Sequence, residues 1–135
     1  MIKGLSHITL ICQDLEKSSY LFCTLFNATE VYSSDAKNFS LSKEKFLLVN
    51  DLWIALMEGP PLPRTYNHIA FHIDEKDLPL YESKIQSLNL ETTSRSRHPL
   101  EGKSLYFYDY DNHLFELHTG DLPTRLNFYQ TELFP

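Results

Sequence analysis

Three side chains that can bind a divalent metal occur where strands are expected. His7 opens the apolar run HITLIC, His68 opens HIAFHI, and Glu116 interrupts LFELH. Burying an isolated ionised carboxylate is costly, so such a residue is usually exposed, paired or bound to a metal. Two imidazoles and one carboxylate form a 2-His-1-carboxylate set. Such a set can hold a divalent metal and leave coordination positions open for substrate and water.

Each of these residues also has a simpler interpretation. Leu114, Glu116 and His118 alternate along their run and would form the solvent-facing side of an edge strand. A lone His at the start of a strand is more often a hydrogen-bonded polar residue than a ligand. The remaining histidines have less support as ligands: His113 is expected in a turn, His98 in a loop, and His72 and His118 beside the site or on the surface.

An internal repeat favours the metal site over these alternatives. GLSHITLICQDLEKSSYLFCTLFNATEVY and TYNHIAFHIDEKDLPLYESKIQSLNLETT each predict a strand, a helix and a strand. A hairpin follows each segment, KFLLVNDLWIALMEG in the first and SLYFYDYDNHLFELHTG in the second. The alignment pairs His7 with His68, Leu25 with Leu88, Asn27-Ala28 with Asn89-Leu90, and Asn50-Asp51 with Asp111-Asn112. The sequence thus predicts an α+β fold of two βαβββ modules, about residues 4–59 and 65–120.

Helix signals support these modules. Asp14 and Asp74 stand where N-caps are expected, although the second helix can begin a residue or more later. Apolar residues recur at helical spacing: Leu15, Tyr20 or Leu21, Leu25 and Phe26 in the first segment, and Leu78, Tyr81, Ile85 and Leu88 in the second. The run GPPLP at 59–63 predicts a stiff linker, because proline cannot continue a ladder. Residues 122–133 are expected to form a C-terminal helix.

Strand alternation places the candidate ligands on one side of each sheet. His7, Thr9 and Ile11 share a face, opposite Ile8, Leu10 and Cys12. In the second module Tyr66, His68, Ala70 and His72 share a face, opposite the expected core residues Ile69, Phe71 and Ile73. With a helix on the other face, the sheets would curve around a metal site in a single domain, residues 1–135. The position that matches Glu116 is near Leu56, so a fourth protein ligand is missing, which favours a catalytic site.

Composition narrows the class of protein. The 135 residues are 42% hydrophobic and 22% charged, as in a soluble globular domain, and the net charge of −6 argues against a nucleic-acid partner. No run reaches the roughly 18 apolar residues of a membrane span, and no signal peptide is evident, so a cytoplasmic protein is expected. Cys12 and Cys23 do not suggest a disulfide framework and are interpreted as apolar fillers.

The motifs GLSHITL, TYNHIAF and YFYDYDNHLFELHTGDLPTRL resemble the vicinal-oxygen-chelate superfamily with its glyoxalase/bleomycin-resistance fold. Within it they resemble the fosfomycin-resistance proteins, over about residues 1–130. SLSKEKFLLVNDLWIALMEG narrows the resemblance to the FosX type, the epoxide-hydrolase branch. The resemblance implies a metal, usually Mn(II) although other divalent ions fit, held by His7, His68 and Glu116. It also implies a swapped homodimer, in which His7 of one subunit joins His68 and Glu116 of the other.

The same resemblance implies the substrate, fosfomycin, a small epoxide with a phosphonate, and a role for Glu44. Glu44 would be the base that activates water for addition to the epoxide, giving a diol. Spacing alone favours another interpretation, in which Lys43-Glu44-Lys45 is an exposed charged turn. For the phosphonate, strand geometry offers Thr9, while the resemblance adds Arg125 and Tyr106. Without the resemblance, Arg125 is a solvated helix residue and Tyr106 is equally well one more strand aromatic.

The segment LEGKS, residues 100–104, departs from relatives that use glutathione, which have a potassium-binding loop there. Lys103 is a candidate to supply positive charge itself, with Arg95 or Arg97 helping. Trp53 and Tyr66 are expected to wall the pocket. Rival functions are a glutathione or bacillithiol transferase, a ring-cleaving dioxygenase that uses ferrous iron in the same triad, and a metal-free module that sequesters the drug unaltered.

Overall fold

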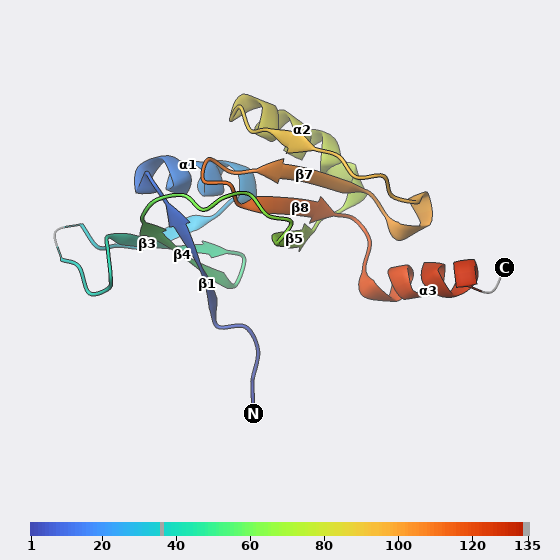
Figure 1. Cartoon of the computed structure of the whole chain (residues 1–135), viewed down its shortest axis with the longest axis horizontal. Helices are drawn as coiled ribbons and strands as arrows, with labels where there is room; N and C mark the ends of the chain where they lie inside the picture. Colours follow the sequence, from blue (N-terminus) through green and yellow to red (C-terminus); the bar gives the residue numbers. More distant parts are fainter. Residues whose placement is uncertain (36, 134–135) are drawn as a thin grey trace. The chain divides into compact units, whose positions relative to one another are not determined.

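The computed structural model describes residues 1–35 and 37–133 and contains the two expected βαβββ modules. The first module consists of β1 His7–Cys12, α1 Leu15–Phe26, β2 Thr29–Ser33, β3 Glu44–Val49 and β4 Leu52–Glu58. The second consists of β5 His68–His72, the 3-10 turn η1 Glu75–Asp77, α2 Leu78–Ser87, β6 Thr92–Thr93, the 3-10 turn η2 Pro99–Glu101, β7 Ser104–Tyr108 and β8 Leu114–His118. The expected C-terminal helix is confirmed as α3, Leu122–Leu133 (Figure 1).

The first module forms a mixed sheet of four strands in the order β1-β4-β3-β2. β1 runs parallel to β4, and the other pairs are antiparallel. Helix α1 covers one face, where Leu21, Phe22 and Leu25 are at most 1% exposed. His7 and Thr9 are exposed on the other face, as the alternation predicted. We call the side of the first sheet that carries His7, Thr9 and Ile11 its open face.

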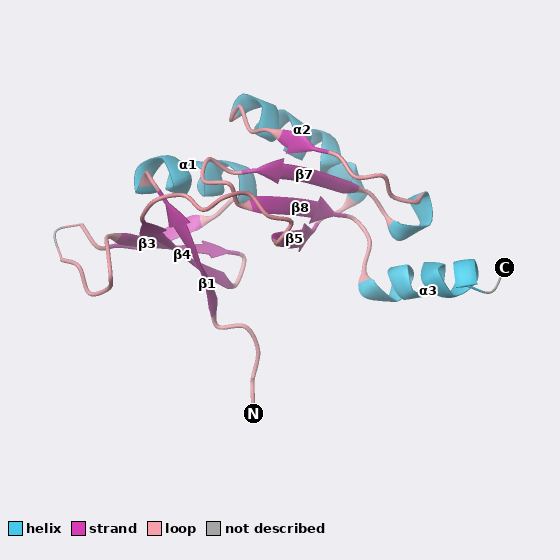
Figure 2. Ribbon diagram, in the orientation of Figure 1, coloured by secondary structure: helices cyan, strands magenta, loops and turns pink. Residues whose placement is uncertain are grey.

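The second module repeats this plan with the order β5-β8-β7-β6, and Figure 2 shows its strands and helices in separate colours. β8 lies between β5, to which it runs parallel, and β7, to which it runs antiparallel. All five residues of β8 are buried. The edge-strand interpretation of Glu116 is therefore wrong, because β8 is a central strand with hydrogen-bonded neighbours on both sides. Ile69 and Phe71, expected in the core, are half-buried.

The ends of the helices explain part of the repeat. Asp14 caps α1 by accepting a hydrogen bond from the Lys17 amide at 3.0 Å, as expected. Asn27 and Asn89, which the repeat aligns, both have a positive φ, 56° and 54°, a conformation that asparagine tolerates well at helix ends. Asp74 makes no side-chain cap and precedes η1, so α2 begins later, at Leu78.

Burial decides between Tyr20 and Leu21 as members of the apolar stripe of α1, and it agrees with the interpretation of the two cysteines. Tyr20 is 66% exposed, whereas Leu21 is fully buried, so Leu21 belongs to the apolar stripe of α1. Cys12 is buried and Cys23 is half-buried, as expected of apolar fillers.

Within the described part of the chain, no helix has the length and apolarity that a membrane crossing requires.

The strand register gives the residue that corresponds to Glu116. Glu116 pairs with Ala70 across β5 and β8, and Ala55 pairs with Thr9 across β1 and β4. The counterpart of Glu116 is therefore Ala55, one position before the expected Leu56. Because the alanine side chain cannot bind a metal, the first module lacks a second carboxylate ligand. This agrees with the expected absence of a fourth protein ligand.

The chain divides into two compact units that follow the modules except at one hairpin tip. Met1–Pro63 and Tyr110–Asn112 form the first unit, and Arg64–Asp109 with the chain from His113 onward forms the second. The tip is held in the first unit by Asp111, which accepts hydrogen bonds from the Gln13 amide at 2.9 Å and the Ser18 hydroxyl at 3.3 Å. That residues 1–135 act as one domain stays a prediction.

Candidate metal centre

His68 and Glu116 lie on the same face of the second sheet and are close enough to share an ion. His68 Nε2 is 3.1 Å from Glu116 Oε1. His68 Nδ1 is 2.8 Å from the Tyr66 carbonyl oxygen, which can only accept a hydrogen bond, so the proton of a neutral ring belongs on Nδ1. The lone pair of Nε2 then faces the carboxylate, which is the arrangement of a metal-binding histidine oriented by a backbone carbonyl.

The distance between these two atoms fits a shared divalent metal. Two ligands about 2.1 Å from one ion, at a right angle, lie about 3.0 Å apart, close to the 3.1 Å observed. Two facing acceptors would otherwise repel each other unless a proton lay between them. His68 and Glu116 therefore fit two adjacent positions around a divalent ion.

The second oxygen of Glu116 is held by groups that donate hydrogen bonds. Ser104 Oγ is 2.6 Å from Oε2, and Arg97 Nη2 is 3.5 Å from it. Burial raises the pKa of Glu116, but hydrogen bonds from Ser104 and Tyr106 and the charges of Arg97 and His118 outweigh burial, so its pKa lies below the ordinary value. Glu116 is thus anionic at neutral pH, although only 3% of it is exposed.

Ser104 is a site residue that the sequence interpretation missed. It occurred there only inside two quoted motifs and was given no role, yet it is the first residue of β7 and pairs with His118 of β8. The signal that could have found it is alternation: Ser104, Tyr106 and Tyr108 share a face, and Tyr106 was already a candidate. Its hydroxyl also lies 2.8 Å from His118 Nδ1.

The sequence left open which of Arg95, Arg97 and Lys103 supplies positive charge to the site, and the structure places the three differently. The side chain of Arg97 is only 8% exposed and donates to the Tyr106 hydroxyl at 2.9 Å. Arg95 reaches the exposed Tyr66, donating to its hydroxyl at 2.7 Å. Lys103 pairs with Glu75 at 2.5 Å on the surface. Arg97 is therefore the one of the three that approaches Glu116. Burial raises the pKa of Tyr106, which keeps its hydroxyl protonated.

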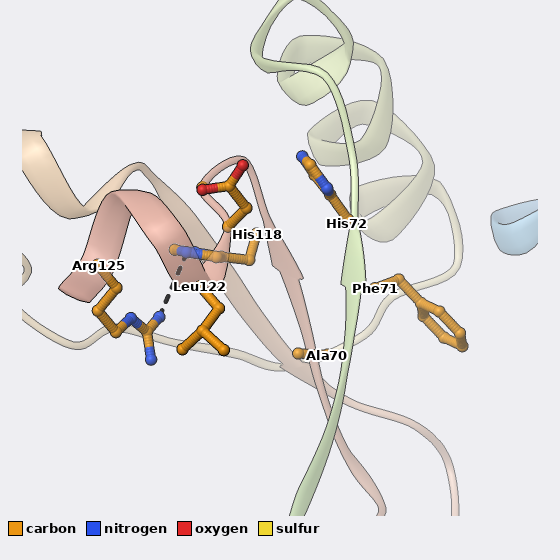
Figure 3. Close-up of a pocket in the computed structure, with 8 residues that line it drawn as sticks. Ala70, Phe71, His72, His118, Leu122 and Arg125 are labelled. Carbon is orange, nitrogen blue, oxygen red and sulfur yellow. Dashed lines mark hydrogen bonds between the residues drawn. The ribbon is translucent and has the colours of Figure 1, made fainter. Parts of the chain in front are cut away.

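A cavity of about 310 Å³ lies beside this cluster in the second unit. Figure 3 shows the guanidinium of Arg125, from α3, pointing at the ring of His118, with Nη2 and Nε2 3.3 Å apart. Burial lowers the pKa of His118, and the positive charges of Arg97 and Arg125 lower it further against the opposing effect of Glu116. The cavity is lined by Ala70, Phe71, His72, His118, Gly120, Asp121, Leu122 and Arg125.

His7 and its neighbours form a separate cluster on the open face of the first sheet. The His7 ring stacks on Trp53, with centroids 4.1 Å apart, because the two residues are partners across β1 and β4. Ser6 Oγ is 3.0 Å from His7 Nδ1. Thr9 and Trp53 belong to the same face. The indole nitrogen of Trp53 is buried and has no hydrogen-bond partner among the described residues. Trp53 thus supports the His7 ring directly.

The structure contradicts the exposed charged turn that spacing alone favoured for Glu44. Glu44 is not in an exposed turn: it begins β3 and is 7% exposed. It is the register partner of Met57, which pairs with Ile11, so Glu44 belongs to the open face that also carries His7 and Thr9. Ser34 holds its backbone amide at 3.0 Å. No side chain of residues 1–35 or 37–133 donates a hydrogen bond to its carboxylate.

The proposed ligands divide between the units: His7 belongs to the first, and His68 and Glu116 to the second. Among the described residues, no three His, Cys, Asp or Glu side chains gather closely enough to hold a metal. The second unit therefore contains two of the three candidate ligands, His68 and Glu116.

Comparisons with known proteins identify the family. The sequence model of the Glyoxalase/Bleomycin resistance protein/Dioxygenase superfamily matches residues 4–117. The chain is 56% identical to the fosfomycin resistance protein FosX of Listeria innocua, over 96% of this chain and 98% of the relative. The chain belongs to this superfamily, and within it to the FosX fosfomycin resistance proteins.

A solved FosX structure agrees with this family assignment. The structure is a mutant FosX of Listeria monocytogenes complexed with Mn(II) and 1S,2S-dihydroxypropylphosphonic acid. It has a TM-score of 0.87 and 52% identity, and the match covers 96% of this chain and 99% of that one. The expected glyoxalase fold is thus confirmed. The metallothiol transferase FosB of Bacillus licheniformis is more distant, at 34% identity over 97% of this chain and 84% of the relative.

Proposed function

We propose that this protein is a metal-dependent hydrolase that adds water to the epoxide of fosfomycin and gives a diol phosphonate. The decisive structural support is the pair of His68 and Glu116, 3.1 Å apart on one sheet face. The 56% identity to FosX supports the substrate. The diol phosphonate bound by the solved FosX of Listeria monocytogenes is what addition of water to this epoxide produces.

His68 and Glu116, completed by His7, would hold the metal, and Mn(II) is the preferred candidate because the solved FosX binds it. When bound, the metal would act as a Lewis acid that polarises the C–O bond of the epoxide. Neighbouring groups orient the proposed ligands. The Tyr66 carbonyl orients His68, and Ser104 and Arg97 keep Glu116 anionic and in place.

Glu44 is the proposed base. As the water oxygen forms a bond to a ring carbon, the ring C–O bond breaks, and Glu44 takes a proton from the water. The ring oxygen takes up a proton from solvent and becomes the second hydroxyl, and Glu44 then releases its proton to solvent. The burial of Glu44 at 7% exposure, with no described side chain donating to its carboxylate, supports this role. A carboxylate that is already hydrogen-bonded would be a weaker base.

The phosphonate would be bound by positive and hydrogen-bonding groups. Arg125, half-buried beside the cavity, and Tyr106 are the main candidates, with Thr9 from the open face. Lys103 remains a candidate, although binding would require it to leave Glu75. Trp53 and Tyr66 would form walls of the pocket.

We also propose a homodimer in the cytoplasm, in which His7 of one subunit completes the centre formed by His68 and Glu116 of the other. This arrangement follows from the family resemblance, and the division of the three ligands between the two compact units is consistent with it, because one unit alone supplies only part of the set. Since C2 dimers are the commonest oligomers, a symmetric dimer with two equal sites is expected.

Phosphorus NMR tests the proposal and separates it from its rivals. Protein, Mn(II) and fosfomycin are incubated with and without glutathione or bacillithiol. We expect diol without any thiol, and a strict thiol requirement would instead identify a transferase. Mn(II), Fe(II), Zn(II) and Ni(II) are compared in the same assay. Oxygen uptake with catechols is expected to be absent, whereas a dioxygenase would consume oxygen. A sequestering module would bind fosfomycin unaltered, and binding would survive His7→Ala.

A further inference from the structure

A continuous series of side chains joins Arg125 to Glu116. Arg125 Nη2 lies 3.3 Å from His118 Nε2, His118 Nδ1 lies 2.8 Å from Ser104 Oγ, and Ser104 Oγ lies 2.6 Å from Glu116 Oε2. His118 and Glu116 are well buried, at 8% and 3% exposure, and Ser104 is half-buried. All four residues belong to the second unit.

The direction of every hydrogen bond in this series is fixed by chemistry. The Arg125 guanidinium can only donate, so His118 Nε2 must accept. The proton of a neutral His118 ring then belongs on Nδ1, which donates to the Ser104 oxygen. Ser104 has a single proton, which it donates to Glu116 Oε2. An ionised carboxylate can only accept, so the series ends there, and donation runs one way from Arg125 to Glu116.

The backbone makes this arrangement rigid. Ser104 and His118 are direct partners across β7 and β8, and Glu116 is two residues before His118 on the same face. A cross-strand pair of this kind holds two side chains about 5 Å apart, within reach of one hydrogen bond. The hydroxyl of Ser104 therefore lies between the acid and the imidazole without any rearrangement of the chain.

We propose that Ser104 and His118 are positioning residues that orient the Glu116 carboxylate toward the metal and the Arg125 guanidinium toward the phosphonate. The inference depends on the proposed function, since it takes Glu116 as a metal ligand and Arg125 as an anion-binding group. Losing Ser104 would leave Oε2 of Glu116 without its shortest hydrogen bond, so the carboxylate would rotate and bind metal less tightly. Partners of metal ligands typically contribute a factor of about 10 to 100 in metal affinity.

One competing explanation uses contacts in the same cluster. His118 Nδ1 is also 3.4 Å from Glu116 Oε2, so His118 could act on the carboxylate directly rather than through Ser104. The two arrangements differ in additivity. If His118 acts through Ser104, its removal has no further effect once Ser104 is gone, whereas a direct contact would add its own effect.

The test is Mn(II) binding to the full-length protein, with free Mn(II) measured by electron paramagnetic resonance. Ser104→Ala and His118→Phe are expected to weaken binding about 10- to 100-fold. Ser104→Thr keeps the hydroxyl, and His118→Asn keeps a donor toward Ser104, so both should stay within a few-fold of wild type. Ser87→Ala is the control, because the Ser87 hydroxyl donates to the Lys84 carbonyl on α2, away from the series. The double variant S104A/H118F should match S104A.

The outcomes distinguish this inference from the proposed function. If the wild type binds no Mn(II), or Glu116→Gln binds it normally, the metal site itself is wrong. If Glu116→Gln abolishes binding while Ser104→Ala stays within two-fold of wild type, only the positioning role is refuted. Additive losses in S104A/H118F would overturn the order of the series. Should S104A fail to fold, His118→Phe against His118→Asn decides: equal affinities would refute the proposal.

Discussion

His68 Nε2 and Glu116 Oε1 are 3.1 Å apart although 48 residues separate them in the chain. The parallel pairing of β5 with β8 brings the strands together, and the Tyr66 carbonyl orients the imidazole. Because Ala70 is the register partner of Glu116, no large side chain stands between the acid and His68. This pair is the structural basis of the candidate metal centre.

Removing the charge of Glu116 should greatly weaken metal binding. We expect Glu116→Gln, which keeps the shape but removes the charge, to lower Mn(II) affinity by at least about 100-fold, because the ion loses its only anionic protein ligand among the proposed three. Isothermal titration calorimetry measures the change. Asp109→Asn is a matched control, since the side chains of Asp109 and Glu116 are both 4% exposed but Asp109 bonds to His113. Wild-type affinity in Glu116→Gln would contradict the site.

Glu44→Gln should fold normally and lose about 10²- to 10⁴-fold in the rate of hydrolysis, since an amide cannot take a proton from water. Glu44→Gly, which removes the side chain altogether, should lose most hydrolysis as well. Phosphorus NMR measures the diol, and calorimetric titration checks that Mn(II) affinity is unchanged. Glu58→Gln, an exposed carboxylate on the neighbouring strand, is the control. Wild-type turnover in Glu44→Gln would mean that another group is the base.

Mixing two inactive variants tests the shared dimer. In a dimer of His7→Ala with Glu116→Gln, one site would carry both defects and the other neither. Equal amounts that exchange freely should therefore regain about a quarter of wild-type activity, since half of the dimers are mixed and each has one intact site. The assay is hydrolysis after the subunits are dissociated and reassociated. Activity that stays at the level of the separate variants would argue against sites shared between subunits.

Arg125→Lys should lower kcat/KM about 10- to 100-fold, mainly through KM, because lysine keeps the charge but loses the planar pair of donors that matches a phosphonate. Steady-state kinetics with fosfomycin measures both constants. Arg64→Lys is the control, since Arg64 pairs with Glu91 on the surface and should change neither constant. A pure loss of kcat would instead indicate that Arg125 acts on the reacting bond.

Lys45 makes part of the stability depend on pH. Its side chain is 6% exposed and bonds to Glu30 at 2.8 Å. This hydrogen bond has the largest effect and lowers the pKa of Glu30; burial raises the pKa, but the hydrogen bond from Ser19 and the charge of Lys45 lower it again, so the pKa lies below its ordinary value. A lowered folded-state pKa contributes stability that is present above the unfolded pKa and is lost as pH falls through the folded pKa.

Glu30→Gln should therefore reduce the free energy of unfolding by at most about 1 kcal/mol at neutral pH, since Glu30 is partly exposed and screened. The difference should vanish at a pH below the folded-state pKa of Glu30. Urea unfolding at fixed protein concentration measures both values. Glu16→Gln is the control, because Glu16 also pairs with Lys45 but is 83% exposed. A difference that persists in acid would rule out ionisation as the cause.

Local patterns in the sequence determined the repeat and the faces of the strands. His7 and His68 recur at equivalent positions, and alternation placed both on the sides away from the helices, because side-chain direction follows the period of a strand. Paired asparagines after the two helices belong to the same pattern, since each local backbone conformation selects the residue. The family resemblance supplied the remaining roles, including that of Glu44.

Only the tertiary structure decided the surroundings of these residues. It showed that Glu44 is buried rather than in an exposed turn, that β8 is central, that Arg97 rather than Lys103 approaches Glu116, and that Ser104 bonds to Glu116. Each result depends on the register between strands that are distant in the sequence. Periodicity within one strand fixes which face a side chain is on, but the pairing of strands fixes its neighbours, and burial follows from those neighbours.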